Sequence, residues 1–547
     1  MISRLLQSAT VPFTAVKVLT DAGVIRFYGP ATLAAVARTV GAWGTGLAGG
    51  VKSASIRYPD RVALVDDLGD ETFAALESRG NAVADSLAAL GVGEGDAVAL
   101  MARNHRYFLE VALGTAKLGA DVVLLNTAFA APQLADVLER ESPVAVVYDA
   151  EFAGLFAHPD VRRVADSWTA VVAWTDDEES LDPGVLTVER LIADGSDSPR
   201  FPPERSSRAI ILTSGTTGTP KGAPRGNASA SAALALLSKI PLRNGDRTLI
   251  AAPLFHTWGW AHLMLGMLLG NAAVLTRRFE PASALRLVSE QRCTAVVVIP
   301  VMLQRILQAP KEVLAGADFS GVRVVASSGS VIPGSIVTAW MDAFGDNLYN
   351  IYGSTEVAWA TIAAPADLRA APTTAGQVPF GTEVRLFDTE GRPVPQGSTG
   401  RIFVGNSMLF EGYTGGGDKE RIDGLMSSGD VGRFDEHGRL FVEGRDDDMI
   451  VSGGENVFPQ EVEEVLAAHP DVVEAAAIGV PDDDFGQRLR GFVVLHEGAV
   501  PNEAALLDHV RSQLARYKVP RELVFLPELP RNATGKIVKR TLGEVDL

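Results

Sequence analysis

The chain has 547 residues, of which 47% are hydrophobic and 21% charged, and its formal net charge is −18. This length exceeds one hydrophobic core and predicts two or three domains of an ordinary globular protein. The acidic balance argues against nucleic acid as a partner. The single cysteine, Cys293, excludes an internal disulfide framework and a cysteine-based zinc site, and it suits a reducing cytosol, so a cytoplasmic protein is expected.

Residues 1–50 differ in character from the rest of the chain. They carry four basic residues against the single acid Asp21, and five apolar residues fall on one helical stripe: Leu33, Val36, Val40, Trp43 and Leu47. Such an extension either packs on the protein itself, which we favour, or lies on an anionic membrane surface. The sequence shows neither an apolar run of transmembrane length nor a convincing signal peptide. Peripheral contact at the inner face of a membrane therefore stays open.

From about residue 55 to residue 446, apolar strand-like runs alternate with helical patterns. The clearest runs are 97–101, 122–125, 144–147 and 295–299, and a helical pattern covers 79–90. This alternation predicts an α/β fold with largely buried sheets. Short strands separated by turns at 384–444 predict a small β-rich subdomain.

Residues 213–222 form the most informative segment, with five hydroxyls, three glycines and one lysine. Such a loop offers a polyphosphate bare N–H groups, hydroxyl donors and a cation. A buried strand is expected before it, at 209–212, and a helix after it, at 227–240, which is an arrangement that handles nucleotides. It is not a Walker A loop, because that pattern needs glycine where Pro220 stands and serine or threonine where Gly222 stands.

This loop resembles the AMP-binding signature of the adenylate-forming superfamily, which includes acyl-CoA synthetases, firefly-type luciferases and the adenylation domains of peptide synthetases. The resemblance covers roughly residues 51–547. It implies an N-terminal AMP-binding domain of stacked α/β layers (51–446), a small mobile α+β C-terminal domain (447–547), and the use of ATP, Mg²⁺ and coenzyme A. The nucleotide contacts it implies in the loop are Thr213, Ser214, Gly215, Thr216, Thr217, Gly218 and Lys221.

Residues 253–260 correspond to the acid-binding pocket of the family, which implies acyl contacts from His256, Trp258, Gly259 and Trp260. Members that activate amino acids have an aspartate at the position of His256. A buried ammonium without a carboxylate partner is costly, so an α-amino acid is disfavoured. The tryptophans suit an apolar acyl chain, although ordinary core packing also accounts for them.

Three further motifs follow in the order of the family. A small-residue loop at 328–330 would border the adenine, Tyr352 would stack on it, and Asp430 with Arg445 would bind the ribose. Thr355 would contact phosphate and Glu356 would hold Mg²⁺, because a carboxylate beside a hydroxyl suits that ion. The full implied set is Ser328, Gly329, Ser330, Asn350, Tyr352, Gly353, Thr355, Glu356, Asp430 and Arg445.

The last hundred residues read as an α+β unit, with a helix from Pro459, a strand at 472–480 and a helix at 503–516. The string at 530–536 matches the catalytic-lysine loop of the family, which implies that Lys536 stabilises the charge moving to the α-phosphate. Asp447 matches the hinge about which the C-terminal domain rotates. Gly453 and Gly454 match the stretch that lines the pantetheine channel.

These motifs predict a medium- or long-chain fatty-acid:CoA ligase that works through acyl-AMP. One alternative is an acyl-AMP ligase serving a carrier protein, although the segment between Glu356 and Asp430 leaves little room for the insertion typical of that group. A second is a non-catalytic lipid-binding or uptake protein of the same fold, disfavoured because Lys536 is intact. Hydrolase signatures are lacking, both Gly-x-Ser-x-Gly and His-Glu-x-x-His. A homodimer stays open.

Overall fold

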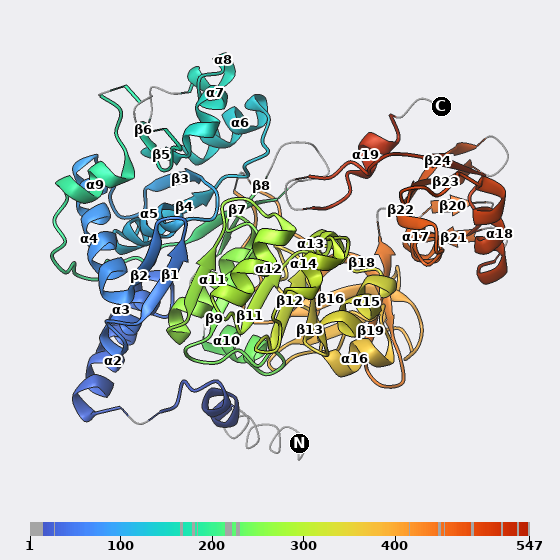
Figure 1. Ribbon diagram of the computed structural model, residues 1–547, viewed down its shortest axis with the longest axis horizontal. Helices are drawn as coiled ribbons and strands as arrows, with labels where there is room; N and C mark the ends of the chain where they lie inside the picture. The colour runs from blue at the N-terminus through green and yellow to red at the C-terminus, as the bar shows by residue number, and fades with distance from the viewer. Residues whose placement is uncertain are drawn as a thin grey trace. The chain divides into compact units, whose positions relative to one another are not determined.

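The computed structural model describes residues 15–26, 28–164, 168–177, 181–182, 184–213, 221–225, 230–414, 416–446, 450–452, 455–482, 486–515, 518–532 and 535–544. The chain forms two compact units (Figure 1). The first comprises residues 1–298, 308–326 and 407–419, and the second comprises 299–307, 327–406 and 420–547. This division differs from the sequence boundary at residue 446, which stays a prediction.

The first unit contains a six-stranded sheet in the order β6-β5-β3-β4-β7-β8. Its strands are β3 (Ala97–Met101), β4 (Asp121–Leu124), β5 (Ala145–Tyr148), β6 (Thr169–Val172), β7 (Ala209–Thr213) and β8 (Lys221–Arg225). All neighbours are parallel except β7 and β8. The central strands are buried on both faces and are therefore apolar without alternation. This confirms the strand runs expected near residues 97, 122 and 144.

A second run of strands in the same unit follows the order β2-β1-β10-β9-β11. They are β1 (Val62–Asp66), β2 (Gly69–Thr72), β9 (Arg247–Ile250), β10 (Ala272–Leu275) and β11 (Ala295–Val298). Only β2 runs antiparallel to its neighbour. The helix α11 (Thr257–Leu269) packs on β9 and β10, so it is apolar on nearly every side.

Further helices complete the first unit. The longer ones are α4 (Phe73–Ala89), α5 (Arg106–Lys117), α6 (Ala131–Glu141) and α12 (Pro281–Glu290). The helix α4 begins six residues before the predicted 79–90 pattern and ends one residue before the end of that pattern. The shorter ones are η1 (Ala150–Phe152), α7 (Ala153–Phe156), α8 (Pro159–Arg162), α9 (Val188–Asp194), α10 (Ala230–Leu237) and α14 (Lys311–Ala315). No helix among the described residues is long and apolar enough to cross a bilayer.

The N-terminal stripe is divided between two helices, α2 (Pro30–Trp43) and α3 (Leu47–Arg57), because Gly44 takes φ of 71° and ends the first. The single continuous stripe expected from the sequence is therefore wrong. Trp43 lies 5.4 Å from the amines of both Lys52 and Lys117, and both amines contact Glu77. These contacts fix the end of the extension to the first unit, as the favoured packing interpretation requires.

The second unit contains three groups of elements. One comprises α13 (Pro300–Leu307), α15 (Gly334–Phe344), α16 (Pro365–Ala370) and the antiparallel pair β13 (Leu348–Tyr352) and β14 (Thr361–Ala363); β12 (Val324–Ser328) lies between α13 and α15 in the chain. Another is a five-stranded sheet of β15 (Glu383–Phe387), β16 (Gly400–Gly405), β17 (Arg421–Ile422), β18 (Leu425–Phe434) and β19 (Leu440–Arg445). This sheet confirms the β-rich subdomain.

The third group is the α+β unit at the C-terminal end, shown in red in Figure 1. Its strands are β20 (Ile450–Ser452), β21 (Glu455–Val457), β22 (Val472–Asp482), β23 (Gly486–Leu495) and β24 (Glu522–Phe525), and its helices are α17 (Pro459–Ala467), α18 (Glu503–Gln513) and α19 (Lys539–Leu542). The helices cover the sheet through a core that includes Val462, Leu466 and Val493. The helix at Pro459 is confirmed, whereas α18 ends three residues earlier than expected because Leu514 is extended.

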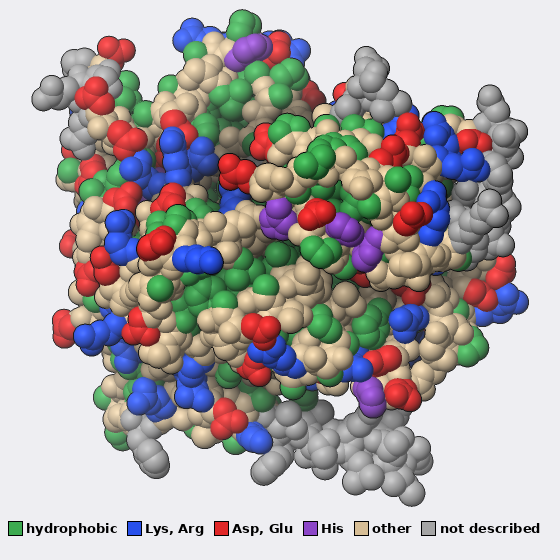
Figure 2. Space-filling view, turned by 45° about the vertical axis from the view of Figure 1, so that its right-hand side comes forward, with side chains coloured by type: hydrophobic (Ala, Val, Ile, Leu, Met, Phe, Trp, Pro, Cys, Tyr) green, Lys and Arg blue, Asp and Glu red, His purple; other side chains and the backbone are tan. Residues whose placement is uncertain are grey.

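Charged side chains are well distributed over the surface despite the net charge of −18. On the face shown in Figure 2, acidic and basic side chains are interspersed. Exposed ion pairs include those of Arg369 with Asp342 and Asp346. Exposed pairs of this kind add little to stability.

Candidate active site

The phosphate loop connects the two strands of a hairpin. Thr213 ends β7 and pairs with Lys221 at the start of β8. The strand expected at 209–212 is confirmed as β7, and α10 lies within the helix expected at 227–240, but the sequence did not predict that residues 221–225 form a strand between the loop and this helix. Pro224 is tolerated there because β8 is the last strand of its sheet. The predicted contacts Ser214, Gly215, Thr216, Thr217 and Gly218 lie outside the described residues.

The segment around Thr414, which is distant in sequence, forms contacts with the hairpin at the start of β8. The backbone N–H of Thr414 donates to the carbonyl of Gly222 at 2.8 Å, and its hydroxyl donates to Glu141 at 2.6 Å. The amine of Lys221 lies 5.1 Å from the ring centroid of Tyr413. Gly222 is needed because a Cβ there would lie 2.3 Å from the Thr414 hydroxyl. Sequence reasoning missed Glu141 and Thr414, since nothing in their local pattern marks them.

The predicted adenine and ribose residues meet in the second unit. The hydroxyl of Tyr352, at the end of β13, donates to Asp430 at 2.5 Å and lies 3.1 Å from the Ser428 hydroxyl. Asp430 on β18 faces Arg445 on β19, with 3.6 Å between Oδ1 and Nη1. Burial and the neighbouring Asp430 raise the pKa of Tyr352 well above its usual value. The phenol is therefore a neutral donor that fixes the Asp430 carboxylate.

Glycines shape the backbone around this group. Gly429 takes φ of 83°, and a Cβ there would lie 3.3 Å from the Arg445 guanidinium. A Cβ on Gly353 would lie 2.1 Å from the carbonyl of Ala358. Gly329 takes φ of 107°, and the adjacent Ser328 hydroxyl donates to the carbonyl of Ile351 at 2.8 Å. Of the other adenine candidates, Asn350 pairs with Ala363 in the β13–β14 ladder, and Ser330 lies half-buried beyond Gly329.

Lys536 lies in the electrostatic neighbourhood of these carboxylates. Desolvation lowers the pKa of Lys536, while Asp430 and Glu356 act in the opposite direction and Arg445 lowers it further. The residue as a whole is exposed. Glu356 is oriented by Ser354, whose hydroxyl donates to Oε2 at 2.8 Å, and half-buried Thr355 lies between them in sequence. The structure thus brings together residues that are 180 positions apart in the sequence.

The loop that carries Lys536 is closed on itself and rests on α13. The backbone N–H of Asn532 donates to the carbonyl of Lys536, and the backbone N–H of Lys536 donates to the side-chain oxygen of Asn532. Gly535, at φ of 78°, lies so close to Ile299 and Val301 that a Cβ would be 2.8 Å from each side chain. On the same helix, Gln304 donates to the carbonyl of Val473 in β22 at 3.2 Å. These contacts set the position of the lysine.

The predicted acyl residues gather on α11 in the first unit. His256 is its N-cap, and the indole N–H of Trp258 donates to the carbonyl of Val298 at 2.9 Å. Trp260 packs edge-on against Phe108 with 6.3 Å between ring centroids. A Cβ on Gly259 would lie 2.4 Å from the carbonyl of Pro253, which explains the glycine. Both tryptophans are buried, so core packing and a pocket lining both fit them.

Sequence reasoning missed His262, which is buried on the same helix. The available signal was a lone titratable residue within an otherwise apolar helix. The predicted hinge Asp447 and the channel residues Gly453 and Gly454 lie outside the described residues.

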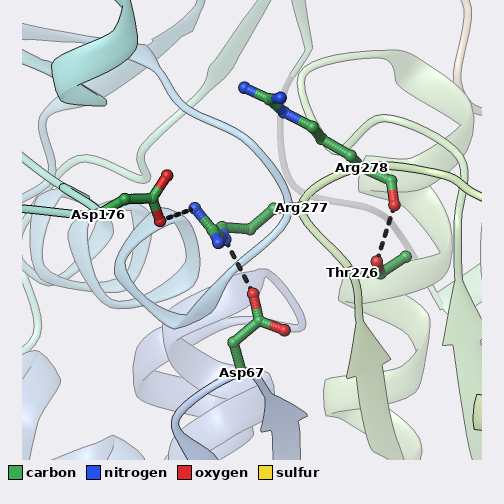
Figure 3. Close-up of a pocket in the computed structure, with 5 residues that line it drawn as sticks. All are labelled: Asp67, Asp176, Thr276, Arg277 and Arg278. Carbon is green, nitrogen blue, oxygen red and sulfur yellow. Dashed lines mark hydrogen bonds and ion pairs between the residues drawn. The ribbon is translucent and has the colours of Figure 1, made fainter. Parts of the chain in front are cut away.

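A surface pocket of about 240 Å³ lies elsewhere in the first unit (Figure 3). It is lined by Asp67, Asp176, Thr276, Arg277 and Arg278. Arg277 contacts Asp67 at 2.8 Å and Asp176 at 2.7 Å, as the dashed lines in Figure 3 show. Because two carboxylates neutralise the guanidinium of Arg277, the pocket is poorly suited to an anion. It contains none of the predicted site residues.

Two family models match the chain. The AMP-binding enzyme model covers residues 51–414, and the AMP-binding enzyme C-terminal domain model covers residues 461–536. The chain is 31% identical to the long-chain-fatty-acid–CoA ligase FadD13 of Mycobacterium tuberculosis, over 86% of this chain and 92% of that protein. It is 33% identical to a feruloyl-CoA synthase of Amycolatopsis sp., over 87% of this chain and 93% of the relative.

A further relative is the fatty acid–[acyl-carrier-protein] ligase ScoC of Streptomyces coeruleorubidus, 30% identical over 86% of this chain and 91% of that protein. Among solved structures, the anthranilate CoA ligase AuaEII in complex with anthranoyl-AMP aligns with a TM-score of 0.83 and 27% identity, over 91% of this chain and 96% of that one. These relatives are named as ligases or synthases of different acids. The chain therefore belongs to the AMP-binding enzyme family, the adenylate-forming group that contains acyl- and aryl-CoA ligases.

Proposed function

We propose that this protein activates a medium- or long-chain fatty acid with ATP and transfers the acyl group to coenzyme A. The observation that carries the proposal is the grouping of Lys536 with Glu356, Asp430 and Arg445 in one electrostatic neighbourhood. A cation held beside the ribose and phosphate candidates suits the charge that develops during adenylation. A lipid-binding protein without turnover would not need this arrangement.

In the first step, a carboxylate oxygen of the acid attacks the α-phosphorus, and the bond from that phosphorus to the bridging oxygen breaks. Acyl-AMP and pyrophosphate result. Lys536 is assigned to hold the negative charge on the α-phosphate and the incoming carboxylate, and Lys221 to hold the phosphates at the end of the loop. Asp430 accepts from the ribose hydroxyls, Arg445 donates to the same sugar, and Tyr352 fixes Asp430 and contacts the base.

In the second step, the sulfur of coenzyme A attacks the acyl carbonyl carbon, the carbon–oxygen bond to AMP breaks, and the thiol proton is lost. We assign Lys536, in the position described, to the first step. We assign the second step to a rotated C-terminal domain, with the hinge at Asp447 and the channel at Gly453 and Gly454, on the grounds of family resemblance.

The donor set near the phosphates fits Mg²⁺. Glu356 is a carboxylate that accepts a hydrogen bond from the hydroxyl of Ser354. Mg²⁺ usually binds one or two protein carboxylates together with phosphate oxygens and water. Glu356 would hold it, and the ion would neutralise phosphate charge.

The buried tryptophans of α11 and the relationship to FadD13 support a fatty acid as substrate. The relationship to ScoC supports a second candidate, transfer to an acyl carrier protein. The test is acid-dependent exchange of pyrophosphate into ATP over saturated acids of increasing length, followed by thioester formation with coenzyme A or a pantetheine-bearing carrier. We expect the apparent affinity to rise by up to about 0.8 kcal/mol per buried methylene. Preference for acetate or benzoate would refute the fatty-acid assignment, and thioester formation on the carrier alone would favour the second candidate.

A further inference from the structure

One buried polar atom on α11 has no hydrogen-bond partner within the described part of the chain. His262 is 3% exposed and is the only titratable residue between Thr257 and Leu269. Its Nδ1 lies 3.2 Å from the carbonyl oxygen of Trp258. Its Nε2 is buried and has no hydrogen-bond partner among the described residues. Nearly all buried polar groups in proteins are hydrogen-bonded, so an orphan calls for an explanation.

The chemistry of the orphan atom follows from its neighbour. A carbonyl oxygen can only accept, so the contact with Trp258 places the ring proton on Nδ1. Burial lowers the pKa of His262 to about 4, so the ring is neutral near pH 7. Nε2 is consequently a lone-pair acceptor and requires a donor.

The position of the ring follows from the helix. Residues four apart lie on the same face of a helix, and the rings of Trp258 and His262 meet with 4.0 Å between centroids. The other end of Trp258 is fixed to the carbonyl of Val298, at the carboxyl end of β11. Ligands of open α/β sheets bind beyond this end of the strands. His262 therefore lies about one helical turn past Trp258 and nearly two turns past His256, where the distal part of an acid would lie if its carboxylate is held near His256.

We propose that His262 is a specificity-determining residue whose Nε2 accepts a hydrogen bond from a hydroxyl or N–H group on the apolar body of the acid substrate. The inference rests on the acid activation proposed for this protein and specifies a polar group that the acid must carry, whether the acid is aliphatic or aromatic. The substrate is an apolar acid with one hydrogen-bond donor remote from its carboxylate. A hydroxylated fatty acid and a ring-hydroxylated aromatic acid share this chemistry, and the experiment separates them.

The physical expectation is a difference between matched acids. An acid with a donor satisfies Nε2, whereas the same acid without it leaves the acceptor unpaired in a dry site. Sites built around a substrate hydroxyl reject the analogue that lacks it much more strongly than an apolar pocket rejects an added hydroxyl. Replacing the ring by an apolar side chain should therefore reverse the preference.

The test uses two matched pairs, ω-hydroxydodecanoate with dodecanoate and para-hydroxycinnamate with cinnamate. For each acid, kcat/KM of pyrophosphate exchange and the ligand-induced shift in Tm are measured on the full chain. The wild type should favour the donor-bearing member of one pair at least about 10-fold, and that pair identifies the aliphatic or aromatic source. In His262→Leu the ratio should fall to one or below, with activity on the unsubstituted acid retained. His262→Gln, which keeps an acceptor oxygen, should keep part of the preference.

Met267→Leu serves as the control, because it is an equally buried and volume-conserving change on the same helix. It should leave the ratio unchanged. A ratio near one for both pairs in the wild type, or an unchanged ratio in His262→Leu, would overturn the inference. If no acid supports exchange, the proposed function fails, while the Tm shifts of the matched pairs still decide the role of His262. If His262→Leu does not fold, the ¹⁵N resonance of Nε2 is measured instead and is assigned by comparison with His262→Gln. This resonance must shift when the donor-bearing acid is added and must not shift with its matched partner.

Discussion

Lys536 is assigned from its own motif at 530–536, whereas the carboxylates that act on its charge, Asp430 and Glu356, come from distant parts of the chain. Lys536→Ala should abolish acid-dependent pyrophosphate exchange, with a loss of about 10²-fold or more, because it removes the cation beside the α-phosphate. Thioester formation from supplied acyl-AMP should be largely spared, since the lysine is assigned to the first step alone. The control is Lys539→Ala, which removes a lysine paired with Glu463 at 2.8 Å in the same loop region. Equal loss in both half-reactions would contradict the assignment.

Glu71 is a second residue whose environment changes its chemistry, in this case the pKa of its carboxyl group. Burial, and then the neighbouring Glu110, raise the pKa of Glu71 to about 8, against the opposing effects of Arg79 and Arg106. Glu110 accepts two hydrogen bonds from Arg79, whereas neither oxygen of Glu71 has a hydrogen-bond partner among the described residues. Glu71 is therefore the carboxyl that keeps its proton in the folded state.

The sign of the pH effect follows from that pKa. Between about pH 4.5 and pH 8 the unfolded chain has lost this proton and the folded chain has not, so stability falls as pH rises. Glu71→Gln should remove this loss of stability with rising pH. Tm should therefore rise at pH 8 but not at pH 5, and the gain in free energy of unfolding at pH 8 should be at most a few kcal/mol. Thermal unfolding at both pH values measures it, with exposed Asp70→Asn as control. A Tm gain of the same size at both pH values would show that Glu71 is ionised when buried.

At the scale of elements, β8 depends on the segment around Thr414. Gly222→Ala would place a Cβ 2.3 Å from the Thr414 hydroxyl, 2.8 Å from Glu141 and 2.9 Å from Ile210. We expect a destabilisation of roughly 1–3 kcal/mol from overpacking, and a rise in KM for ATP because Lys221 is displaced. Thr414→Ala in addition should recover part of both. Gly154→Ala, where a Cβ meets nothing within 4 Å, is the matched control. An unchanged KM for ATP in Gly222→Ala would show that β8 does not position Lys221.

At the scale of the molecule, two reactions must share one bound acyl-AMP. A proline at a hinge restricts φ to near −65° and limits rotation. Asp447→Pro should preserve pyrophosphate exchange and reduce thioester formation by orders of magnitude, since the described arrangement already presents Lys536. The two half-reactions are measured on one preparation, with Asp446→Ala as control. A thioester step at the wild-type rate would place the hinge elsewhere.

Membrane contact through the N-terminal extension is the remaining whole-molecule question. Val16, Ile25 and Leu33 are exposed apolar residues near basic ones. If the extension binds membranes, full-length protein should co-sediment with anionic vesicles at low salt, where attraction is least screened. Lys17→Glu with Arg38→Glu should reduce that fraction several-fold without affecting activity on dispersed acids. Protein that ignores such vesicles would leave packing as the only role of the segment.

The sequence by itself determined the α/β class, the C-terminal α+β unit and the family. These follow from local information, because period and motif order are written along the chain. It could not show that residues 221–225 form a strand or that the N-terminal stripe breaks after Trp43, because β pairing and the turn at Gly44 depend on partners and on φ.

Tertiary structure alone decided which distant groups meet. Thr414 reaches Gly222, Lys536 approaches Glu356 and Asp430, and Glu71 is left beside Glu110 without a hydrogen-bond partner among the described residues. Likewise, the sequence indicated only that α11 is apolar, and the structure showed that the buried Nε2 of His262 has no hydrogen-bond partner in the part of the chain that is described. Burial and pairing depend on which segments the fold brings together, so they follow from long-range packing and not from any short stretch of sequence.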